Sequence, residues 1–343
     1  MRIAQLAPLF MTVPPAEYGG TERIVSALTE ELVKRKHQVT LFAAPGSQTS
    51  AQLDVTSPAP LWASGGNPLT WHAIEIEEMI RRSGEFDVIH SHLEVIPWLG
   101  GSRYKAPLVT TLHGRLDQDE QRKAFTEFRE WPLVSISNSQ RRPVEDLNLN
   151  WRATVYHGLD LEHTYSLGTG KGGYLAFVSR LAPEKGPDLA IKVARKAGMK
   201  LLMAGPVPDS DRDFFESRVK PLIKGADVEL TGELDDAGKN ELIGNAAGFL
   251  VPIQWDEPFG LAFIEALATG TPIISCPRGS LPELIEPGRH GFLEMDEDGL
   301  AAACQKLDDI DRSECRRYVV ERFSTARMAA DYERVYQRLV AGD

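Results

Sequence analysis

The chain has 343 residues, a length that accommodates two domains, each with its own hydrophobic core. Residues 1–165 carry 16 basic and 20 acidic side chains, hence −4, and the remainder carries 22 and 29, hence −7, which together give the net charge of −11. Neither half is basic, and this argues against nucleic acid as a partner and against strong binding to an anionic membrane.

The sequence also predicts where the protein resides. No apolar run reaches 18 residues, so we expect no membrane span, and a strand-like run begins at Met1, which leaves no room for a signal peptide. The three cysteines are too sparse for a disulfide framework and contain no C-x-x-C pair. We therefore expect reduced thiols in a cytoplasmic protein.

The first part of the chain predicts a strand at 1–10, a loop at 14–22, a helix at 23–36 and then a second strand. This order is typical of a doubly wound α/β domain. Gly19 and Gly20 precede the helix, where backbone amides could contact a phosphate or a sugar. A simple turn is the alternative interpretation, since the G-x-G-x-x-G pattern is absent.

Residues 51–72 are rich in Pro, Ser and Gly and predict an irregular connection. The strand that follows ends in His90 and His92, which share a face and could bind a metal. No third ligand is evident nearby, so we interpret them as polar residues at a strand end. Another buried strand ends at His113, on the edge of the sheet where open α/β folds bind ligands; a purely structural histidine is the alternative.

The glycine-rich stretch 163–173 predicts a domain boundary. It contains GTGKGG, which lacks the spacing of a phosphate-binding P-loop. Strands and helices alternate again after it, so we expect two doubly wound, Rossmann-like α/β domains at 1–165 and 166–323. A last helix at 324–343 should have one apolar side, formed by Met328, Tyr332, Val335, Tyr336 and Leu339.

The stretch 255–274 combines two carboxylates with a glycine-bearing loop and a helix start. Glu257 and Glu265 stand eight residues apart, with Gly260 between them and an apolar helical run after it. Glycine lets backbone approach a ligand, and the amides of the helix start can hold an anion. A sugar nucleotide offers hydroxyls, a diphosphate and further hydroxyls in that order. An ordinary surface helix with two solvated acids explains the spacing equally well.

The segment EPFGLAFIEALATGTPII, from Glu257 onward, resembles the Glu-x7-Glu segment of family 4 of the retaining glycosyltransferases, which have the GT-B fold of two Rossmann-like domains facing a cleft. YGGTER resembles the glycine loop of that family that faces the donor, and TLHG resembles its histidine against the donor sugar and phosphate. SRLAPEKG resembles its second motif, which holds the donor diphosphate. The resemblance covers nearly the whole chain.

The resemblance implies a transferase that moves a hexose, by default glucose from UDP-glucose, to a small-molecule or glycan acceptor with retention of configuration. It assigns Glu257 to sugar hydroxyls, Glu265 to the ribose, and Arg180 and Lys185 to the departing diphosphate. The catalytic set it implies consists of His113, Arg180, Lys185 and Glu257. The donor-binding set it implies consists of Gly19, Gly20, Phe259, Gly260, Leu261 and Glu265. The helix at 324–343 would cross back onto the first domain, and the acceptor would meet variable loops such as 51–72.

The resemblance also implies that no metal and no other cofactor is needed. The acidic pairs Asp235-Asp236 and Asp308-Asp309 are adjacent and do not form a D-x-D motif. Two other functions stay open. A non-catalytic protein that binds sugar nucleotides would keep the same residues, and a retaining glycosidase would use two carboxylates but leave the SRLAPEKG loop unexplained. Finally, Ser280 and Glu283 have the spacing of a helix capping box.

Overall fold

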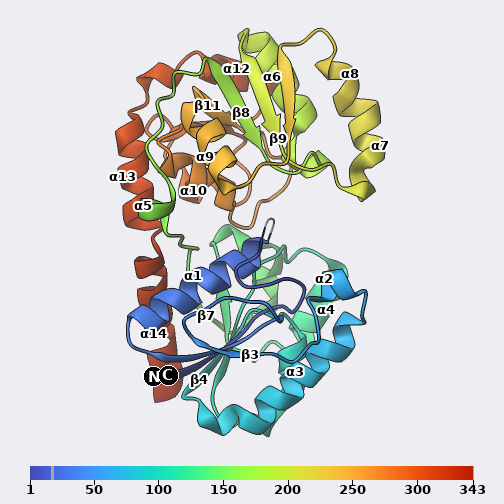
Figure 1. Cartoon of the computed structure of the whole chain (residues 1–343), viewed down its shortest axis with the longest axis vertical. Coiled ribbons are helices and arrows are strands. Elements are labelled where there is room, and N and C mark those ends of the chain that lie inside the picture. Colours follow the sequence, from blue (N-terminus) through green and yellow to red (C-terminus); the bar gives the residue numbers. More distant parts are fainter. Residues whose placement is uncertain (17–18, 343) are drawn as a thin grey trace. The chain divides into compact units, whose positions relative to one another are not determined.

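The structure is a computed structural model that describes residues 1–16 and 19–342 (Figure 1). The chain forms two compact units, one made of Met1–Leu159 with Ser324–Asp343 and the other of Asp160–Phe323. We expected the change of domain between residues 165 and 166. In the structure the first crossing lies between Leu159 and Asp160, so that the glycine-rich stretch belongs wholly to the second unit.

The first unit contains a parallel sheet of seven strands in the order β3-β2-β1-β4-β5-β6-β7. The strands are β1 (Arg2–Leu6), β2 (Gln38–Phe42), β3 (Gln52–Asp54), β4 (Val88–Ser91), β5 (Leu108–Thr111), β6 (Leu133–Ser135) and β7 (Trp151–Thr154). The helices are α1 (Gly20–Lys34), α2 (Leu61–Ser64), α3 (Pro68–Arg82), α4 (Asp119–Glu127) and α14 (Thr325–Ala341). Each strand is parallel to its neighbours, which requires a crossover between them and explains the alternation of strands and helices.

Successive side chains of a strand point to opposite faces of the sheet. In this sheet, helices cover both faces. Phe42 of β2 packs in one hydrophobic cluster with Met79 of α3. Its neighbours Leu41 and Ala43 pack in another cluster with Val25 of α1. The helices α1 and α3 therefore cover different faces, as a doubly wound fold requires.

The region 51–72 is more regular than we predicted. It contains β3, α2 and the first turn of α3. The side chain of Asn67 accepts a hydrogen bond from the amide of Leu69, and Pro68 occupies the first helical position. These are strong helix-start signals. The prediction of an irregular connection is wrong here because Pro, Ser and Gly also occur at the starts and ends of short helices.

The last helix, α14, completes the first unit. Tyr332 and Tyr336 have no exposed surface, whereas Leu339 at the end of the expected apolar side is half-buried. Outside this buried side, Glu333 of α14 forms an ion pair with Arg35 at 2.7 Å, which joins the helix to the end of α1. Both hydrophobic packing and an ion pair therefore hold α14 in the first unit.

The second unit contains a parallel sheet of six strands in the order β10-β9-β8-β11-β12-β13. The strands are β8 (Tyr174–Val178), β9 (Lys200–Ala204), β10 (Val228–Gly232), β11 (Gly248–Leu250), β12 (Ile273–Ser275) and β13 (Gly291–Leu293). The main helices are α6 (Pro187–Ala197), α9 (Asp236–Asn245), α10 (Leu261–Ala268), α12 (Glu297–Cys304) and α13 (Arg312–Arg322). Shorter helices are α5 (Leu161–Thr164), α7 (Arg212–Phe214), α8 (Lys220–Ile223) and α11 (Leu281–Leu284).

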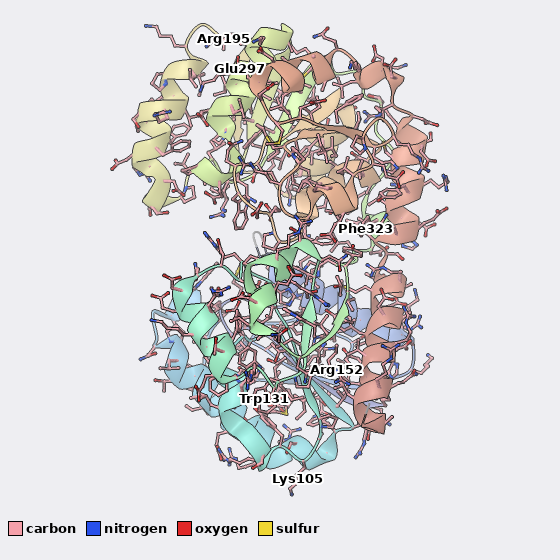
Figure 2. All side chains as sticks on the ribbon, turned by 180° about the vertical axis from the view of Figure 1, so that it is seen from behind. Lys105, Trp131, Arg152, Arg195, Glu297 and Phe323 are labelled. Atoms are coloured by element: carbon pink, nitrogen blue, oxygen red, sulfur yellow. The ribbon has the colours of Figure 1, made fainter. Side chains whose placement is uncertain are left out.

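The helices α6 and α12 lie side by side in the second unit. Lys196 near the end of α6 approaches Glu297 at the start of α12 to 3.9 Å, and Figure 2 labels Arg195 and Glu297 close to each other.

Within residues 1–16 and 19–342, no helix is long and apolar enough to cross a membrane.

We predict that Tyr336→Phe destabilises the first unit although the ring is kept. The phenol oxygen lies 3.3 Å from Gln5 Nε2 and 2.8 Å from His90 Nδ1, and its loss leaves both buried groups short of a partner. An unsatisfied buried polar group costs about 1–3 kcal/mol, which urea unfolding would measure. As a control, Val340→Ala on the exposed side of α14 should change the free energy of unfolding by less than about 0.5 kcal/mol. Equal stabilities of Tyr336→Phe and the unchanged chain would contradict this account.

Candidate functional site

The loop after β11 leads into α10 through Gly260. This glycine has a φ of 91° and stands at the N-cap position without a side-chain cap. A Cβ added to it would lie 2.7 Å from the ring of Phe263 and 3.3 Å from Cγ of Glu257. Both the dihedral angle and the close approach therefore require glycine here. No side chain of the described residues caps the start of α10, so its first amides can meet a ligand, and the helix dipole favours an anion there.

Glu257 lies in this loop and forms an ion pair with Lys185. Lys185 Nζ is 2.5 Å from Glu257 Oε2, and the two side chains keep only 15% and 11% of their surface exposed. The indole Nε1 of Trp255 donates a hydrogen bond to the same oxygen at 3.1 Å. The ammonium of Lys185 also lies 5.1 Å from the centre of the Trp255 ring, within the range of a cation–π interaction.

Lys185 and Arg180 belong to the loop after β8. Lys185 ends a 3-10 turn, Pro183–Lys185, and Arg180 pairs with Glu184 of that turn at 2.7 Å. The amide of Gln254 donates to the carbonyl of Glu184 at 2.8 Å, so the loop after β8 is bonded to the loop after β11. Because β8 and β11 are neighbouring strands, two loops far apart in the sequence meet at one sheet edge. The structure thus brings Lys185 and Glu257 into contact.

The loop that contains Gly279 and Ser280 holds Glu257 and its neighbours in place by hydrogen bonds. The amide of Ser280 donates to the carbonyl of Glu257 at 2.9 Å, and the amide of Gly279 donates to Asp256 Oδ1 at 3.1 Å. The hydroxyl of Ser280 donates to the carbonyl of Phe259 at 2.6 Å. The predicted capping box is wrong, since Ser280 makes no side-chain cap hydrogen bond to α11. Its hydroxyl bonds to the loop of Glu257 and does not cap the start of α11.

The other expected residues of this segment differ in accessibility. Glu265 is half-buried on α10, and within the described part of the chain its carboxylate takes no hydrogen bond or ion pair. Leu261 is also half-buried. Phe259 is 2% exposed, and its ring packs edge-on against Phe323 at 5.9 Å. The Phe259 side chain is therefore part of the hydrophobic core.

In the first unit, His113 follows β5 and belongs to a chain of hydrogen-bonded side chains. Gln5 Oε1 accepts from His92 Nε2 at 2.7 Å, so the proton of neutral His92 is on Nε2. His92 Nδ1 then accepts from His113 Nε2, which lies 2.9 Å away. His113 Nδ1 is buried and has no hydrogen-bond partner among the residues that the structure describes.

The same chain continues to α14. Gln5 Nε2 donates to the hydroxyl of Tyr336, which in turn lies beside His90 Nδ1. His90 Nε2 is 2.7 Å from Thr111 Oγ1, and that hydroxyl is 2.9 Å from the hydroxyl of Tyr332. His90 and His92 therefore act as hydrogen-bonding residues of the sheet edge, as we interpreted them. Burial lowers the pKa of His90 to about 3, with a smaller effect of His113.

The glycine pair of the first unit stands at the start of α1. Gly19 is the N-cap residue, and a Cβ on it would lie 2.8 Å from Pro15 and 3.1 Å from the carboxylate of Glu22. Gly20 is the first residue of the helix. Residues 17–18 of the same loop, and with them the tyrosine of YGGTER, lie outside the described residues.

Sequence reasoning missed three residues of these two clusters. Trp255 opens the stretch 255–274, and an indole two residues before Glu257 can reach its carboxylate. His157 stacks on His113 with ring centres 5.2 Å apart, and Gln5 stands in the middle of the first strand. A polar residue within a buried strand, as Gln5 is, was the available signal, because buried polar groups need partners.

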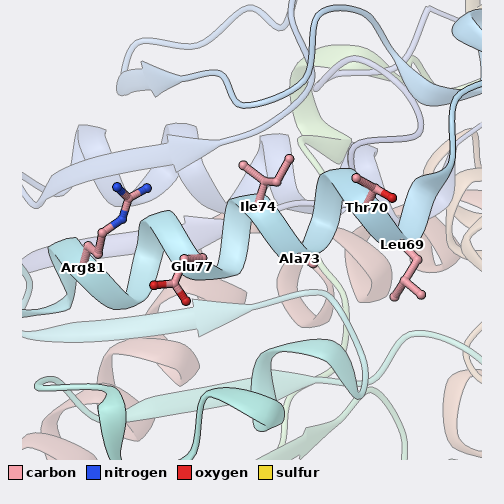
Figure 3. A pocket seen from close by; sticks show the side chains of 6 residues that line it. All are labelled: Leu69, Thr70, Ala73, Ile74, Glu77 and Arg81. Carbon is pink, nitrogen blue, oxygen red and sulfur yellow. The ribbon is translucent and has the colours of Figure 1, made fainter.

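A shallow hollow of about 480 Å³ lies along the outer side of α3 (Figure 3). Its lining consists of Leu69, Thr70, Ala73, Ile74, Glu77 and Arg81. All six come from one helix, so the hollow lacks the convergent polar groups from several elements that mark a small-molecule site.

Two family models match the chain. "Glycosyltransferase Family 4" matches residues 18–163, and "Glycosyl transferases group 1" matches residues 166–319. A phosphatidyl-myo-inositol mannosyltransferase of Mycobacterium leprae is 24% identical over 98% of this chain and 96% of its own length. A D-inositol 3-phosphate glycosyltransferase of Mycolicibacterium smegmatis is 25% identical over 63% of this chain, and the match spans only 58% of that relative.

Solved structures share the fold at low identity. Sucrose-phosphate synthase of Thermosynechococcus elongatus matches with a TM-score of 0.81 at 19% identity, covering 100% of both chains. HepE of Anabaena, in complex with UDP and glucose, matches with a TM-score of 0.78 at 17% identity, covering 98% of this chain and 99% of its own. The two-domain architecture is therefore that of the GT-B proteins.

We predict that acid weakens the first unit through its buried histidines. In the unfolded chain His90 has its ordinary pKa of 6.5, whereas in the folded protein its pKa is about 3. Between these values the unfolded state binds more protons, so the free energy of unfolding falls as the pH is lowered from 6.5 towards 3. The slope from this residue is at most about 1.4 kcal/mol per pH unit.

Urea unfolding between pH 7.5 and 4.5 would measure this slope. His90→Gln should reduce it, whereas the control His163→Gln, whose side chain is 76% exposed, should leave it nearly unchanged. The explanation fails if both variants lose stability with acid as steeply as the unchanged chain.

Proposed function

The chain belongs to family 4 of the glycosyltransferases, and on that premise we propose that it moves a hexose from a nucleoside diphosphate sugar to an acceptor hydroxyl, with retention of the anomeric configuration and without a metal ion. The observation that carries the proposal is the Lys185–Glu257 pair, whose carboxylate lies in the loop before the N-terminus of α10, a helix start that has no side-chain cap among the described residues. A cation, a carboxylate and an anion-binding helix start together match a diphosphate that bears a sugar. UDP-glucose is the default donor, because HepE, with the same fold, was solved with UDP-glucose.

The departing diphosphate gains negative charge as the glycosidic bond breaks. Arg180 can grip two phosphate oxygens, Lys185 supplies a point charge, and the start of α10 adds a partial positive charge. Interactions that strengthen with this charge lower the barrier more than they tighten binding of the intact donor. This set of positive groups could take the part that a magnesium ion takes in other transferases.

His113 and Glu257 would contact the transferred sugar, and Glu265 the ribose of the donor. Gly19 and Gly20 would allow the backbone of the first unit to approach the donor. A non-catalytic protein that binds sugar nucleotides is the second candidate. The carboxylate of Glu265, which has no partner among the residues that the structure describes, suits it equally well. A purified sample that binds UDP-glucose but neither transfers nor hydrolyses its sugar would favour that second candidate.

We predict a fall in turnover of roughly 10²–10³ for Arg180→Ala and for Lys185→Ala, by analogy with the removal of one oxyanion donor. Donor affinity should fall much less, because the interaction grows in the transition state. Single-turnover rates at saturating UDP-glucose would measure the effect. Activity should survive EDTA, so loss of activity in EDTA with recovery on adding Mg²⁺ or Mn²⁺ would overturn the mechanism, as would near-normal turnover of the double variant.

We predict that the two glutamates act on different parts of the donor. Glu265→Gln should weaken binding of free UDP by about 1.5–3 kcal/mol, the value of a hydrogen bond to a charged group. Glu257→Gln should keep affinity for UDP but lose turnover and discrimination between sugars. Isothermal titration with UDP, followed by rates with UDP-glucose and UDP-galactose, separates the two effects. The assignment is refuted if both variants bind UDP as the unchanged chain does.

A further inference from the structure

We propose that Trp255 is a positioning residue that orients the carboxylate of Glu257 for recognition of the donor sugar. Its indole N–H holds Oε2 of Glu257, which leaves Oε1 for a sugar hydroxyl. The inference rests on the proposed function and adds a residue to it.

Two donors converge on one oxygen of this carboxylate. Trp255 Nε1 and Lys185 Nζ both reach Oε2, at 3.1 and 2.5 Å. Oε1 of Glu257 takes no hydrogen bond from the described residues 1–16 and 19–342. The carboxylate is therefore held on one side and open on the other, and a carboxylate oxygen is an acceptor that suits a hydroxyl.

The two donors differ in what they do to the charge. The ammonium of Lys185 carries a full charge on a flexible stem, and a diphosphate bound beside it would compete with Glu257 for its three hydrogens. The indole is neutral, rigid and donates a single hydrogen. Trp255 can therefore keep the orientation of Glu257 when Lys185 turns towards phosphate, without cancelling the negative charge that a sugar hydroxyl meets.

The face of the same ring lies under Lys185. The distance of 5.1 Å from Nζ to the ring centre permits a cation–π attraction that holds the ammonium near the diphosphate position. One side chain thus contacts both groups, with its edge on the carboxylate and its face on the ammonium. A substitution can remove the N–H contact alone or both contacts together.

The residues on both sides of Trp255 are held by hydrogen bonds, Gln254 through its backbone and Asp256 through its side chain. The amide of Gln254 donates to the Glu184 carbonyl, and Asp256 accepts from the amide of Gly279. A Cβ on Gly279 would lie 2.3 Å from the backbone of Glu257, so the supporting loop packs tightly against the residue that Trp255 orients. A rigid support of this kind is what a positioning residue needs in order to act.

The test compares Trp255→Phe with Trp255→Leu. Phenylalanine keeps an aromatic face for Lys185 and removes the N–H, whereas leucine removes both. We expect Trp255→Phe to bind UDP within about threefold of the unchanged chain and to lose about tenfold or more in kcat, a loss the size of one hydrogen bond to a charged group. Its preference for UDP-glucose over monodeoxy analogues should shrink as well. Trp255→Leu should in addition weaken UDP binding about two- to fivefold, as expected for a lost cation–π contact.

A double-mutant cycle separates positioning from a general structural role. If Trp255 acts through Glu257, then Trp255→Phe should have little further effect on kcat or on sugar preference in the Glu257→Gln background. The matched control is Trp98→Phe in the first unit, which removes a buried indole hydrogen bond to Thr110 Oγ1 of 2.9 Å. It should lower the midpoint of thermal unfolding and leave sugar preference unchanged.

The outcomes distinguish this inference from the proposed function. An unchanged chain that binds no UDP, GDP or ADP and transfers no sugar would overturn both. If that chain is active but Trp255→Phe keeps its full kcat and sugar preference, or if the cycle is additive, only the role of Trp255 is overturned. A loss confined to UDP affinity would also overturn it, because that pattern assigns the indole to Lys185 alone.

Discussion

The ion pair between Lys185 and Glu257 is the interaction on which the candidate site depends. Both side chains are mostly shielded from water, and a buried charge is tolerated only beside a partner. The pair joins the loops after β8 and β11, and each charge keeps the other in a region that would otherwise exclude it. Such a pair contributes little net stability to the fold. It does hold a cation and a carboxylate side by side, where one ligand can bind to both.

The alternation of strands and helices, and with it the fold, was accessible from the sequence, because periodicity reports which faces of an element are buried. The strand order was not accessible. In the sheet β8 lies between β9 and β11. The pairing of β8 with β11 brings the loop of Lys185 next to the loop of Glu257. The resemblance supplied the residues of the site, whereas the pairing between them required the sheet. The prediction of an irregular connection at 51–72 was wrong, although Asn67 and Pro68 are the residues typical of a helix start.

The same contrast holds for the polar groups of the site. Ser280 has the spacing of a capping residue, yet its hydroxyl reaches the carbonyl of Phe259. A local pattern gives the local partner only when no tertiary partner competes, and here the carbonyl of Phe259 competes with the amides of α11. Trp255 escaped notice for a related reason. A tryptophan two residues before a glutamate forms no recognisable sequence pattern. Its role depends on which carboxylate oxygen its indole reaches, and only the structure shows this.

The first unit is made of two separate stretches of chain, and this has a consequence for its biosynthesis. Tyr332 and Tyr336 of α14 complete a buried polar chain with Gln5, His90 and Thr111, so these groups lack their partners until α14 is present. A ribosome must translate all of Asp160–Phe323 before it reaches Ser324. The second unit, continuous in sequence, can therefore fold during synthesis, while the unit that begins first is completed last.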